Sequence, residues 1–313
     1  MTIQPMKQPK VSIIILNYNG LTDTIECLES LKKITYPNYD TIVVDNDSAG
    51  DDVKVLREKY GNYLHIVEND KNYGFAGGNN IGMRYALTNS NPDYLLLLNN
   101  DTIVDPEFVT EMVKVTESDP AIGAAVAKIY LYHKPNRLES VGSKINMWRG
   151  QCFRIGWMRK DTEQYEKLRE LDAAATNSLL ITKGVIQNVG FFDESYFIYL
   201  DDADYCVRVR RAGYKIVYVP KAKIWHKVGA SARRVTGLPY YYLARNNFRF
   251  MRQHATKWQY RCFLAYFFVC HLWLMTGAYL IYFRSLRVLL GFYRGVRDGL
   301  FNSTAAAKFY GGN

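Results

Sequence analysis

The sequence predicts an α/β fold in which a mostly parallel central sheet is flanked by helices, followed by a hydrophobic and amphipathic helical segment. Three observations support this prediction. Short β-branched or apolar runs alternate with stretches of helical periodicity in the first third of the chain, a pattern typical of parallel βαβ units. Several of these runs end in Asn or Asp. Near the C-terminus, a long uncharged stretch is flanked by arginines.

The first predicted strand, residues 11–16, ends in Asn17-Tyr18-Asn19-Gly20, and Thr22 or Asp23 is the expected cap of the next helix. Further strands are expected at 41–44, 64–67 and 94–98, with helices at 52–60 and after the loop Asn72-Tyr73-Gly74-Phe75-Ala76-Gly77-Gly78-Asn79-Asn80.

Polar residues follow three of these strands: Asn17 and Asn19, Asp45 and Asn46, and the triplet Asn99-Asn100-Asp101. The carboxyl ends of parallel strands share one edge of a sheet, and ligands of open α/β sheets bind there. The alternative is that each group forms a polar turn. Neither G-x-G-x-x-G nor a P-loop motif follows a strand. A nucleotide would therefore be bound by side-chain amides and carboxylates together with a metal.

The second half is predicted to contain a helix at 107–117, a strand at 122–132, an irregular stretch at 133–171 and a small apolar segment at 173–182. Asp201-Asp202-Ala203-Asp204 then leads into a basic helix, 207–212, which Gly213 would end. A strand at 215–219 precedes Trp225-His226.

The composition restricts the partners of the chain. Lys and Arg number 40 against 30 Asp and Glu in 313 residues, a net charge of +10, so nucleic acid, acidic lipid and nucleotides are all candidates. The arginines concentrate around the apolar tail and no nucleic-acid motif is found, so no nucleic-acid partner is predicted. The five scattered cysteines lack a C-x-x-C pair, which favours reduced thiols in a cytosolic setting without structural zinc. No signal peptide is expected.

Several segments, in this order, resemble family 2 glycosyltransferases, the inverting enzymes of GT-A fold that include rhamnosyl- and galactofuranosyltransferases: VSIIILNYNG, IVVDNDS, NYGFAGGNN, LLLLNNDT, GFFDESYFIYLDDADYCVRVRRAGY and WH. The resemblance covers about residues 10–230. It implies a lead-in at 1–10, a catalytic domain at 11–240 with a nucleotide half at 11–105 and an acceptor half at 106–240, and a membrane-associated region at 241–313.

The resemblance also implies roles for individual residues. Asn17, Asn19, Asp45 and Asn46 would line the nucleotide pocket, and Asn72, Ala76 and Asn79 would close over the ribose and the donor sugar. Asn99, Asn100 and Asp101 occupy the place of the family's D-x-D metal motif. Because Asn99 replaces its first acid, Asp101 is the only carboxylate of the triplet. One carboxylate with substrate phosphates can still hold Mg²⁺, and His226 as a second ligand would favour Mn²⁺. A structural histidine is the alternative.

Inverting transfer needs a base for the acceptor hydroxyl and positive charge on the departing diphosphate. The resemblance assigns the base to Asp202 and an acceptor contact to Asp201. The alternative is that Asp201 or Asp202 caps the helix, with Asp204 interacting with the helix dipole.

The stretch from Cys262 to Phe283 carries no formal charge. As a helix it would be about 33 Å long at roughly 1.5 Å per residue, enough to cross a hydrocarbon core of about 30 Å. Beyond it, Leu286, Leu289, Leu290 and Tyr293 lie opposite Arg284, Arg287 and Arg294, as in a basic amphipathic helix on an anionic bilayer. We expect an in-plane or re-entrant segment in preference to a span; a buried helix or a dimer interface is the alternative.

The predicted function is therefore sugar transfer from a nucleotide-sugar donor to a lipid-linked or cell-surface glycan at the cytoplasmic face of a membrane. The resemblance to rhamnosyltransferases implies dTDP-rhamnose as the donor, and another hexose or galactofuranose is the alternative. A glycoside hydrolase also uses two carboxylates, but adjacent Asp201 and Asp202 are poorly placed to flank one bond.

Overall fold

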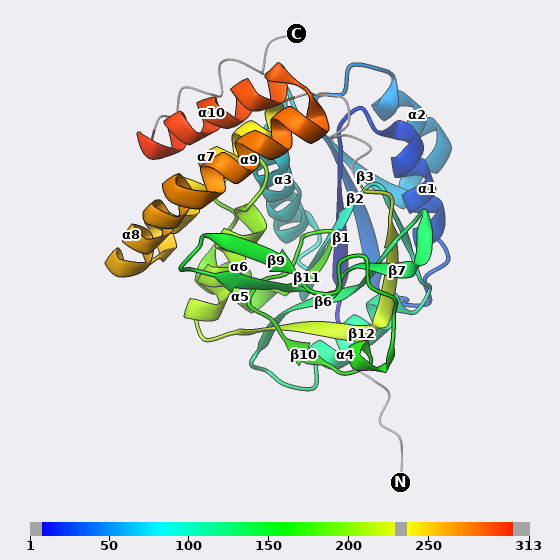
Figure 1. Cartoon of the computed structure of the whole chain (residues 1–313). Coiled ribbons are helices and arrows are strands. Elements are labelled where there is room, and N and C mark those ends of the chain that lie inside the picture. The colour runs from blue at the N-terminus through cyan, green and yellow to red at the C-terminus, as the bar shows by residue number, and fades with distance from the viewer. Residues whose placement is uncertain (1–7, 229–236, 303–313) are drawn as a thin grey trace.

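The computed structural model describes residues 8–228 and 237–302, which form an α/β core with a helical layer on one side (Figure 1). The core is built on one ten-stranded sheet in the order β10-β12-β6-β11-β4-β1-β2-β3, with β5 paired to β12 and β7 paired to β6. Its strands are β1 (Val11–Asn17), β2 (Tyr39–Asp45), β3 (Leu64–Glu68), β4 (Tyr94–Asn99), β5 (Thr102–Val104), β6 (Ile122–Leu131), β7 (Lys134–Ser140), β10 (Arg169–Glu170), β11 (Ser178–Thr182) and β12 (Lys215–His226).

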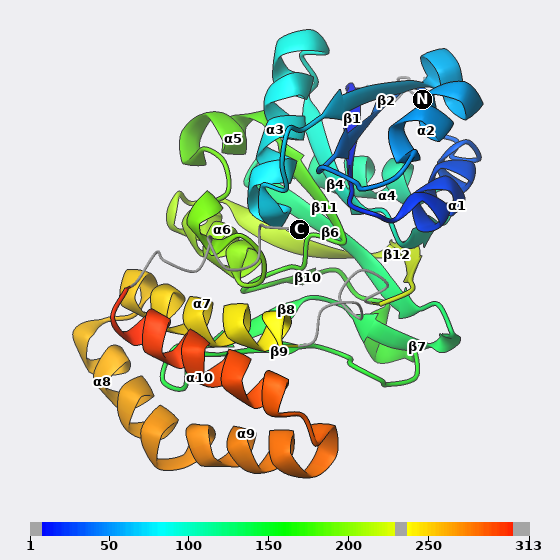
Figure 2. The same cartoon turned by 90° about the horizontal axis from the view of Figure 1, so that it is seen from above.

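The helices of the core connect and cover these strands (Figure 2). They are α1 (Leu21–Leu31), α2 (Asp52–Tyr60), α3 (Gly74–Asn89), α4 (Phe108–Thr116), α5 (Lys183–Val189) and α6 (Asp201–Arg211). Short 3-10 turns lie at Gly61–Tyr63, Glu163–Tyr165 and Glu194–Tyr196.

The predicted parallel arrangement is confirmed for β1 to β4, which pair in parallel around β1. Their central residues are fully buried, as expected of strands covered on both faces. The register places Asn17 beside Asp45, and Leu16 beside Asn99. The polar ends of three strands that are distant in sequence therefore meet at one edge of the sheet.

The second half makes the sheet mixed. β11 is antiparallel to both of its neighbours, β4 and β6. β12 runs parallel to β6 and, after an irregularity near Val219, continues to His226. The strand therefore extends beyond the predicted range 215–219. In this extension His226 pairs with Thr102 of β5, which two residues separate from the end of β4.

Four local predictions were wrong. Helix α3 begins at Gly74, inside the stretch Asn72–Asn80 (hereafter the donor loop), which was expected to be a loop before the helix. Residues 133–171 are not irregular, since they contain β7, β10 and a separate hairpin of β8 (Ser143–Asn146) and β9 (Gln151–Arg154). Helix α1 begins at Leu21 after Gly20, so neither Thr22 nor Asp23 caps it. Helix α6 begins at Asp201 and not at Val207. The Asp-rich segment therefore forms the first turn of the helix, where carboxylates are compatible with the helix dipole.

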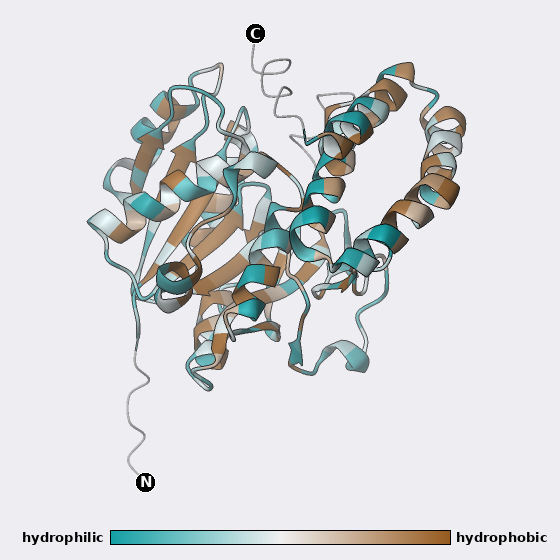
Figure 3. Cartoon of the chain, turned by 90° about the vertical axis from the view of Figure 1, so that its left-hand side faces the viewer, coloured by the Kyte–Doolittle hydropathy of each residue, from teal (hydrophilic) through white to brown (hydrophobic). Residues whose placement is uncertain are grey.

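The C-terminal region is a layer of helices packed beside α6: α7 (Leu238–His254), α8 (Lys257–Tyr266), α9 (Leu272–Ala278) and α10 (Leu286–Leu300), with π-helical turns at Phe267–His271 and Tyr279–Phe283. α8, the two π-helical turns and α9 form one long helix, Lys257–Phe283, hereafter the apolar helix. By length and composition it could cross a membrane. Figure 3 shows its hydrophobic colouring.

Glycines set the packing of this layer. A Cβ on Gly291, Gly295 or Gly299 would lie 2.4, 2.2 or 2.9 Å from backbone oxygens of Gly237, Tyr241 and Arg245, respectively. Helix α10 therefore lies in direct backbone contact with α7, and both run in the same direction. The apolar helix connects the end of α7 to the start of α10 and must return along them (Figure 2).

Candidate active site

The ends of β1 and β2 form a hydrogen-bonded polar corner around Asn17. Its amide nitrogen donates to carboxylate oxygens of Asp45 (2.8 Å) and Asp52 (2.9 Å), and its oxygen accepts from Thr24 Oγ1 (2.7 Å). Asn17 is fully buried and Asp45 nearly so. The structure thus brings the predicted nucleotide residues together, with Asn17 in a position to orient the Asp45 carboxylate.

Ser48 connects this corner to Asn19. Its hydroxyl donates to Asp45 Oδ1 (2.7 Å) and accepts from the Asn19 backbone N–H (2.8 Å). The Asn19 side chain in turn accepts from the Ala49 N–H (2.8 Å). Asn19 has a φ of 51°, in the left-handed region that Asn tolerates better than most residues. These contacts hold the two turns after β1 and β2 against each other.

Asn46 anchors the predicted donor loop. Its amide donates to Asn72 Oδ1 (2.9 Å) and to the Gly74 carbonyl (3.1 Å). Asn79, nearly buried, donates to the Phe75 carbonyl within α3 (2.8 Å), and Ala76 is fully buried. Asn46 and Asn72 therefore hold the start of α3 beside the end of β2, while Asn79 and Ala76 face the interior.

Asn80 is a residue of this loop for which the sequence suggested no role. It is fully buried, and its amide nitrogen donates to the Phe192 carbonyl (2.9 Å) while its oxygen accepts from the Phe192 N–H (3.0 Å). These two bonds connect the donor loop to the segment that precedes α6.

The Asn99-Asn100-Asp101 triplet lies at the end of β4, where Asp101 meets His226. Asp101 Oδ1 is 2.9 Å from His226 Nε2, and the Asn99 amide nitrogen is 3.4 Å from the same ring atom. Asn100 instead donates to Thr24 Oγ1 (3.0 Å), toward the Asn17 corner. Asn99 Oδ1 is buried without a hydrogen-bond partner among the described residues, as expected of an atom that meets a ligand.

His226 has a second carboxylate neighbour that the sequence did not indicate. Its Nδ1 is 2.6 Å from Glu139 Oε2, and Glu139 is only 2% exposed. Burial by itself lowers the pKa of His226, but the hydrogen bonds to Asp101 and Glu139 outweigh burial and raise that pKa to about 9. Burial also raises the pKa of Asp101, but the hydrogen bond from His226 together with the positive charges of His226 and Lys227 outweighs burial, so this pKa lies below its usual range.

This arrangement fits a divalent cation with two protein ligands. Asp101 and His226 Nε2 face each other, and a cation would take the place of the proton between them. Glu139 on Nδ1 supplies the carboxylate that commonly orients a metal-binding histidine. The described residues contain no preformed group of three or more His, Cys, Asp or Glu side chains able to hold a metal. Donor phosphates would therefore have to complete the coordination.

The carboxylates of α6 differ from one another in environment. Asp204 accepts from Arg208 Nε (2.9 Å) and from His254 Nε2 (2.7 Å), so it has a structural role. Asp201 is 2% exposed and its Oδ2 has no partner among the described residues. Asp202 is partly exposed, and its Oδ1 accepts from the adjacent Ala203 N–H (2.7 Å). The N-cap residue is Leu200, so the capping alternative for Asp201 and Asp202 was wrong.

Burial controls the protonation of this pair. It raises the pKa of Asp202, and it raises the pKa of Asp201 well above its usual range, with the neighbouring Asp202 charge adding to the effect. The positive charge of Arg154 partly opposes the shift at Asp202. A carboxylate with a raised pKa is a stronger base than a solvated one.

Arg154 connects the two groups of carboxylates. It lies at the end of β9, and its Nη1 is 3.0 Å from Glu139 Oε1. Glu139 in turn contacts His226, so the chain Arg154–Glu139–His226–Asp101 runs from the surroundings of Asp202 to the end of β4. Sequence reasoning missed both Glu139 and Arg154, because the segment that carries them was expected to be irregular.

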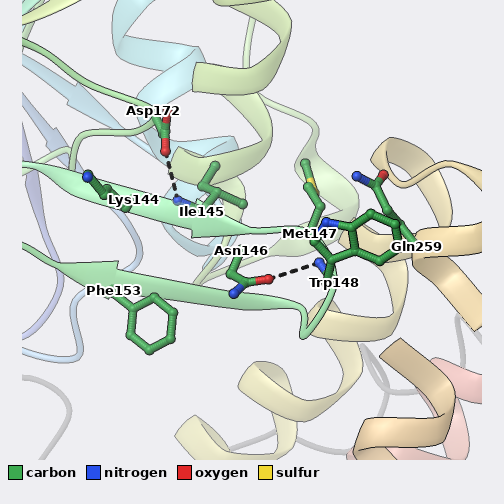
Figure 4. A pocket seen from close by; sticks show the side chains of 8 residues that line it. All are labelled: Lys144, Ile145, Asn146, Met147, Trp148, Phe153, Asp172 and Gln259. Atoms are coloured by element: carbon green, nitrogen blue, oxygen red, sulfur yellow. Dashed lines mark hydrogen bonds between the residues drawn. The ribbon is translucent and has the colours of Figure 1, made fainter. Parts of the chain in front are cut away.

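A cavity of about 450 Å³ lies beside the β8–β9 hairpin (Figure 4). Its lining residues come from both strands, from the turn between them, from the segment between β10 and β11, and from α8: Lys144, Ile145, Asn146, Met147, Trp148, Phe153, Asp172 and Gln259. Figure 4 shows Trp148 next to Gln259 of α8. The hairpin thus contacts the helical layer through its tip, while Arg154 at its other end contacts Glu139.

Comparison with known proteins gives a consistent picture. Residues 12–183 match the family described as Glycosyl transferase family 2. The low-salt glycan biosynthesis hexosyltransferase Agl10 of Haloferax volcanii is 27% identical over 219 residues, 68% of this chain and 66% of that protein. The dTDP-rhamnosyl transferase RfbF of Shigella flexneri is 22% identical over 258 residues, 77% of this chain and 79% of that protein.

Solved structures support the same fold. The mannosyltransferase PcManGT from Pyrobaculum calidifontis, in complex with GDP-Man and Mn²⁺, aligns with a TM-score of 0.57 at 15% identity, covering 96% of this chain and 89% of that one. The expected GT-A architecture is thereby confirmed. The chain spans slightly less than two thirds of the length of Agl10, at 66%.

Proposed function

The chain belongs to glycosyl transferase family 2, and on that premise we propose that it moves a sugar from a nucleotide-sugar donor to an acceptor hydroxyl with inversion at the anomeric carbon. The observation that carries this proposal is the Asp201–Asp202 pair at the start of α6. Burial raises the pKa of both carboxyls, and Asp201 Oδ2 lacks a partner among the described residues. A structural pair would have its oxygens satisfied, as those of Asp204 are.

Asp202 is the proposed base because it is the more exposed of the two. Its carboxylate takes the proton of the acceptor hydroxyl while that oxygen attacks the anomeric carbon. The bond from this carbon to the diphosphate oxygen breaks, and its electron pair leaves with the nucleotide diphosphate. Asp201, nearly buried, contributes an acceptor contact through Oδ2.

Asp101 and His226 are the proposed ligands of a divalent cation, Mn²⁺ or Mg²⁺. When bound, the cation supplies positive charge to the departing diphosphate. The protein prepares this site by holding the imidazole between Asp101 and Glu139. The Asn99 oxygen has no partner in the described part of the chain, and Asn99 is the proposed contact to the same ligand set, with Asn100 securing the turn.

The nucleotide is proposed to bind over the Asn17–Asp45 corner, with Asn19 and Asn46 at its sides. The donor loop with Asn72, Ala76 and Asn79 borders the sugar. The RfbF relative supports dTDP-rhamnose as donor, whereas PcManGT is a complex with GDP-Man. Another hexose or galactofuranose is the alternative.

A direct test incubates the protein with Mn²⁺, a panel of UDP-, GDP- and dTDP-sugars and a lipid-linked acceptor, and measures nucleotide diphosphate release with glycolipid formation. We expect one donor class to be consumed. Asp202→Asn should still bind that donor in a thermal-shift assay but lose 10²- to 10⁴-fold in turnover, the usual contribution of a general base. Turnover of Asp202→Asn within twofold of the wild type would refute Asp202 as the base.

The acceptor is proposed to be lipid-linked, because the apolar helix exposes a hydrophobic face. Trp273, Leu274 and Ile281 are 63%, 66% and 68% exposed, which is unusual for a soluble surface. Exposed basic residues lie around this face: Lys257, Arg261, Arg284, Arg287, Arg294 and Arg297. This combination favours docking on an anionic bilayer at the cytoplasmic face.

The orientation we propose is in the plane of the membrane. The start of the apolar helix follows the end of α7, and its end returns to the start of α7, where Tyr279 and Phe283 contact Tyr240 with ring centroids 5.0 and 5.4 Å apart. α7 itself packs on the catalytic core through Asn246. Both ends of the apolar helix are therefore tied to the same side.

Co-sedimentation with vesicles tests this surface. The wild type should bind vesicles of phosphatidylcholine with 25% phosphatidylglycerol, and it should bind less to vesicles of pure phosphatidylcholine. Trp273→Glu with Leu274→Glu should reduce the bound fraction at least tenfold, because each change places a charge on the docking face. Leu168→Glu, at an exposed site of the core, is the matched control. Unchanged binding of the double variant would contradict the proposal.

A further inference from the structure

The turn that precedes α6 has an unusual backbone. Phe197, Tyr199 and Leu200 have φ values of 65°, 67° and 63°. Bulky side chains rarely adopt this region, because it strains the backbone. Three such residues within four positions persist only if the surrounding structure holds them. Because the Leu200 carbonyl accepts the Asp204 N–H (2.9 Å), the geometry of this turn determines where α6 begins.

Two adjacent residues of α7 hold the turn. Asn246, fully buried, donates its amide hydrogens to the carbonyls of Tyr196, Ile198 and Tyr199, at 3.0, 2.8 and 2.8 Å. Arg245 Nη2 donates to the carbonyls of Ser195 and Tyr196, both at 2.8 Å. The Asn246 and Arg245 side chains are thus directed at the backbone carbonyls of the turn, one of which, that of Tyr196, also accepts the Ile198 N–H (2.8 Å).

The same turn contacts the donor loop. The Phe197 carbonyl accepts the N–H groups of Phe75 (2.6 Å) and Ala76 (3.2 Å) at the start of α3. Gly74 permits this approach, since a Cβ there would lie 2.5 Å from the Phe197 oxygen, and its own φ is 74°. The turn that contains Phe197 therefore contacts both the donor loop and the start of α6, and α7 holds this turn in place.

We propose that Asn246 and Arg245 are positioning residues for the transfer reaction: they hold the strained turn Phe197–Leu200 so that Asp202 is presented to the acceptor beside the donor loop. This inference rests on the proposed function for its catalytic consequence. It adds a role for α7, because the helix that connects the core to the membrane-docking layer also sets the position of the base.

A purely structural role for Asn246 would lower stability and leave the turnover of the folded enzyme unchanged. A positioning role lowers kcat in the folded protein and loosens the turn locally. Donor affinity should change less than kcat, because Asn46 and Asn72 still hold the start of α3 when the contact from the Phe197 carbonyl loosens. A positioning role is thus recognised by a lower kcat with a nearly unchanged KM for the donor, and by faster local backbone dynamics. A purely structural role changes neither in the folded enzyme.

The experiment compares Asn246→Ala with Asn247→Ala, a neighbour on α7 that makes none of these hydrogen bonds. Hydrogen–deuterium exchange should rise at least tenfold in peptides covering 195–203 for Asn246→Ala alone. Its kcat should fall about 100-fold, the effect of a displacement near 1 Å, with the KM for the donor within threefold. Adding Leu200→Gly, which removes the cost of a positive φ at that position, should recover part of the kcat.

Unchanged exchange in 195–203 together with kcat within twofold would overturn the proposal. If Asn246→Ala does not fold, Arg245→Lys replaces it, because lysine keeps the charge but cannot donate to two carbonyls from one planar group. The exchange measurement needs no substrate. A wild type that transfers no sugar would therefore refute the proposed function, while the exchange result would still decide whether α7 holds the turn.

Discussion

The polar corner at Asn17 and the turn that precedes α6 differ in how their polar groups are paired and in how strained their backbones are. At the corner, the amide and carboxylate groups of Asn17 and Asp45 are buried and satisfied by one another. At the turn, the backbone is strained, and Asp201 has a raised pKa and an oxygen for which residues 8–228 and 237–302 provide no hydrogen-bond partner. The first region stabilises the fold and offers a fixed surface to a ligand. The second costs stability, which is the usual sign of a reactive site.

The largest effect that would test this contrast is expected at the corner. Asn17→Ala leaves the Asp45 and Asp52 carboxylates buried without their shared donor. Asp45 keeps its hydrogen bonds from Ser48, whereas Asp52 loses the Asn17 donor. Removing a donor that two buried carboxylates share should cost about 2–4 kcal/mol in the free energy of unfolding, measured by urea denaturation. Asn89→Ala, an exposed asparagine on α3, should cost less than about 0.5 kcal/mol. A small loss for Asn17→Ala would mean that the corner does not stabilise the fold.

An intermediate effect is expected where the two regions are connected, at Glu139. Glu139→Gln keeps the shape but removes the carboxylate that orients His226. Affinity for Mn²⁺ should fall about 10- to 100-fold, as followed by the electron paramagnetic resonance signal of free Mn²⁺ in the presence of UDP, GDP or dTDP. Glu163→Gln, exposed and remote from His226, should leave the affinity unchanged. Equal affinities for the two variants would exclude this role of Glu139.

The smallest expected effect is a gain in stability, because the substitution removes the cost of burying a charged carboxylate. Asp201 has a pKa raised above its unfolded value. Its contribution to stability is therefore complete below the unfolded pKa and is lost as the pH rises through the folded pKa. Asp201→Asn should raise the Tm by about 2 °C at pH 8, for a gain of ~1 kcal/mol. The gain should shrink at pH 5. A lower Tm than the wild type at pH 8 would show that the Asp201 carboxylate is stabilised by the fold.

Much of the architecture could be predicted because it follows from the local spacing of apolar and polar residues. The apolar runs of β1 and β4, with Asn17 and Asn99 at their ends, predicted both the strands and the polar edge. The apolar stretch after Cys262 predicted its helix. Prediction failed for residues 133–171, whose short strands have no periodicity of their own. β7 and β10 form where β6 and β12 provide partners, while β8 and β9 pair with each other. The contact of Glu139 with His226 follows from the pairing of β7 with β6.

The sequence by itself determined the alternating strands, the family, the residue types at the sheet edge and the apolar tail, because each is a matter of local spacing or of motif order. Tertiary structure alone decided that α6 begins at Asp201 and that Asn246 holds the turn before it. It also decided that Glu139 contacts both His226 and Arg154. These contacts join residues far apart in the chain, such as Asn246 and Ile198. Hydrogen bonds to strained backbone and buried carboxylates depend on which segments the fold brings together, and no local pattern encodes that.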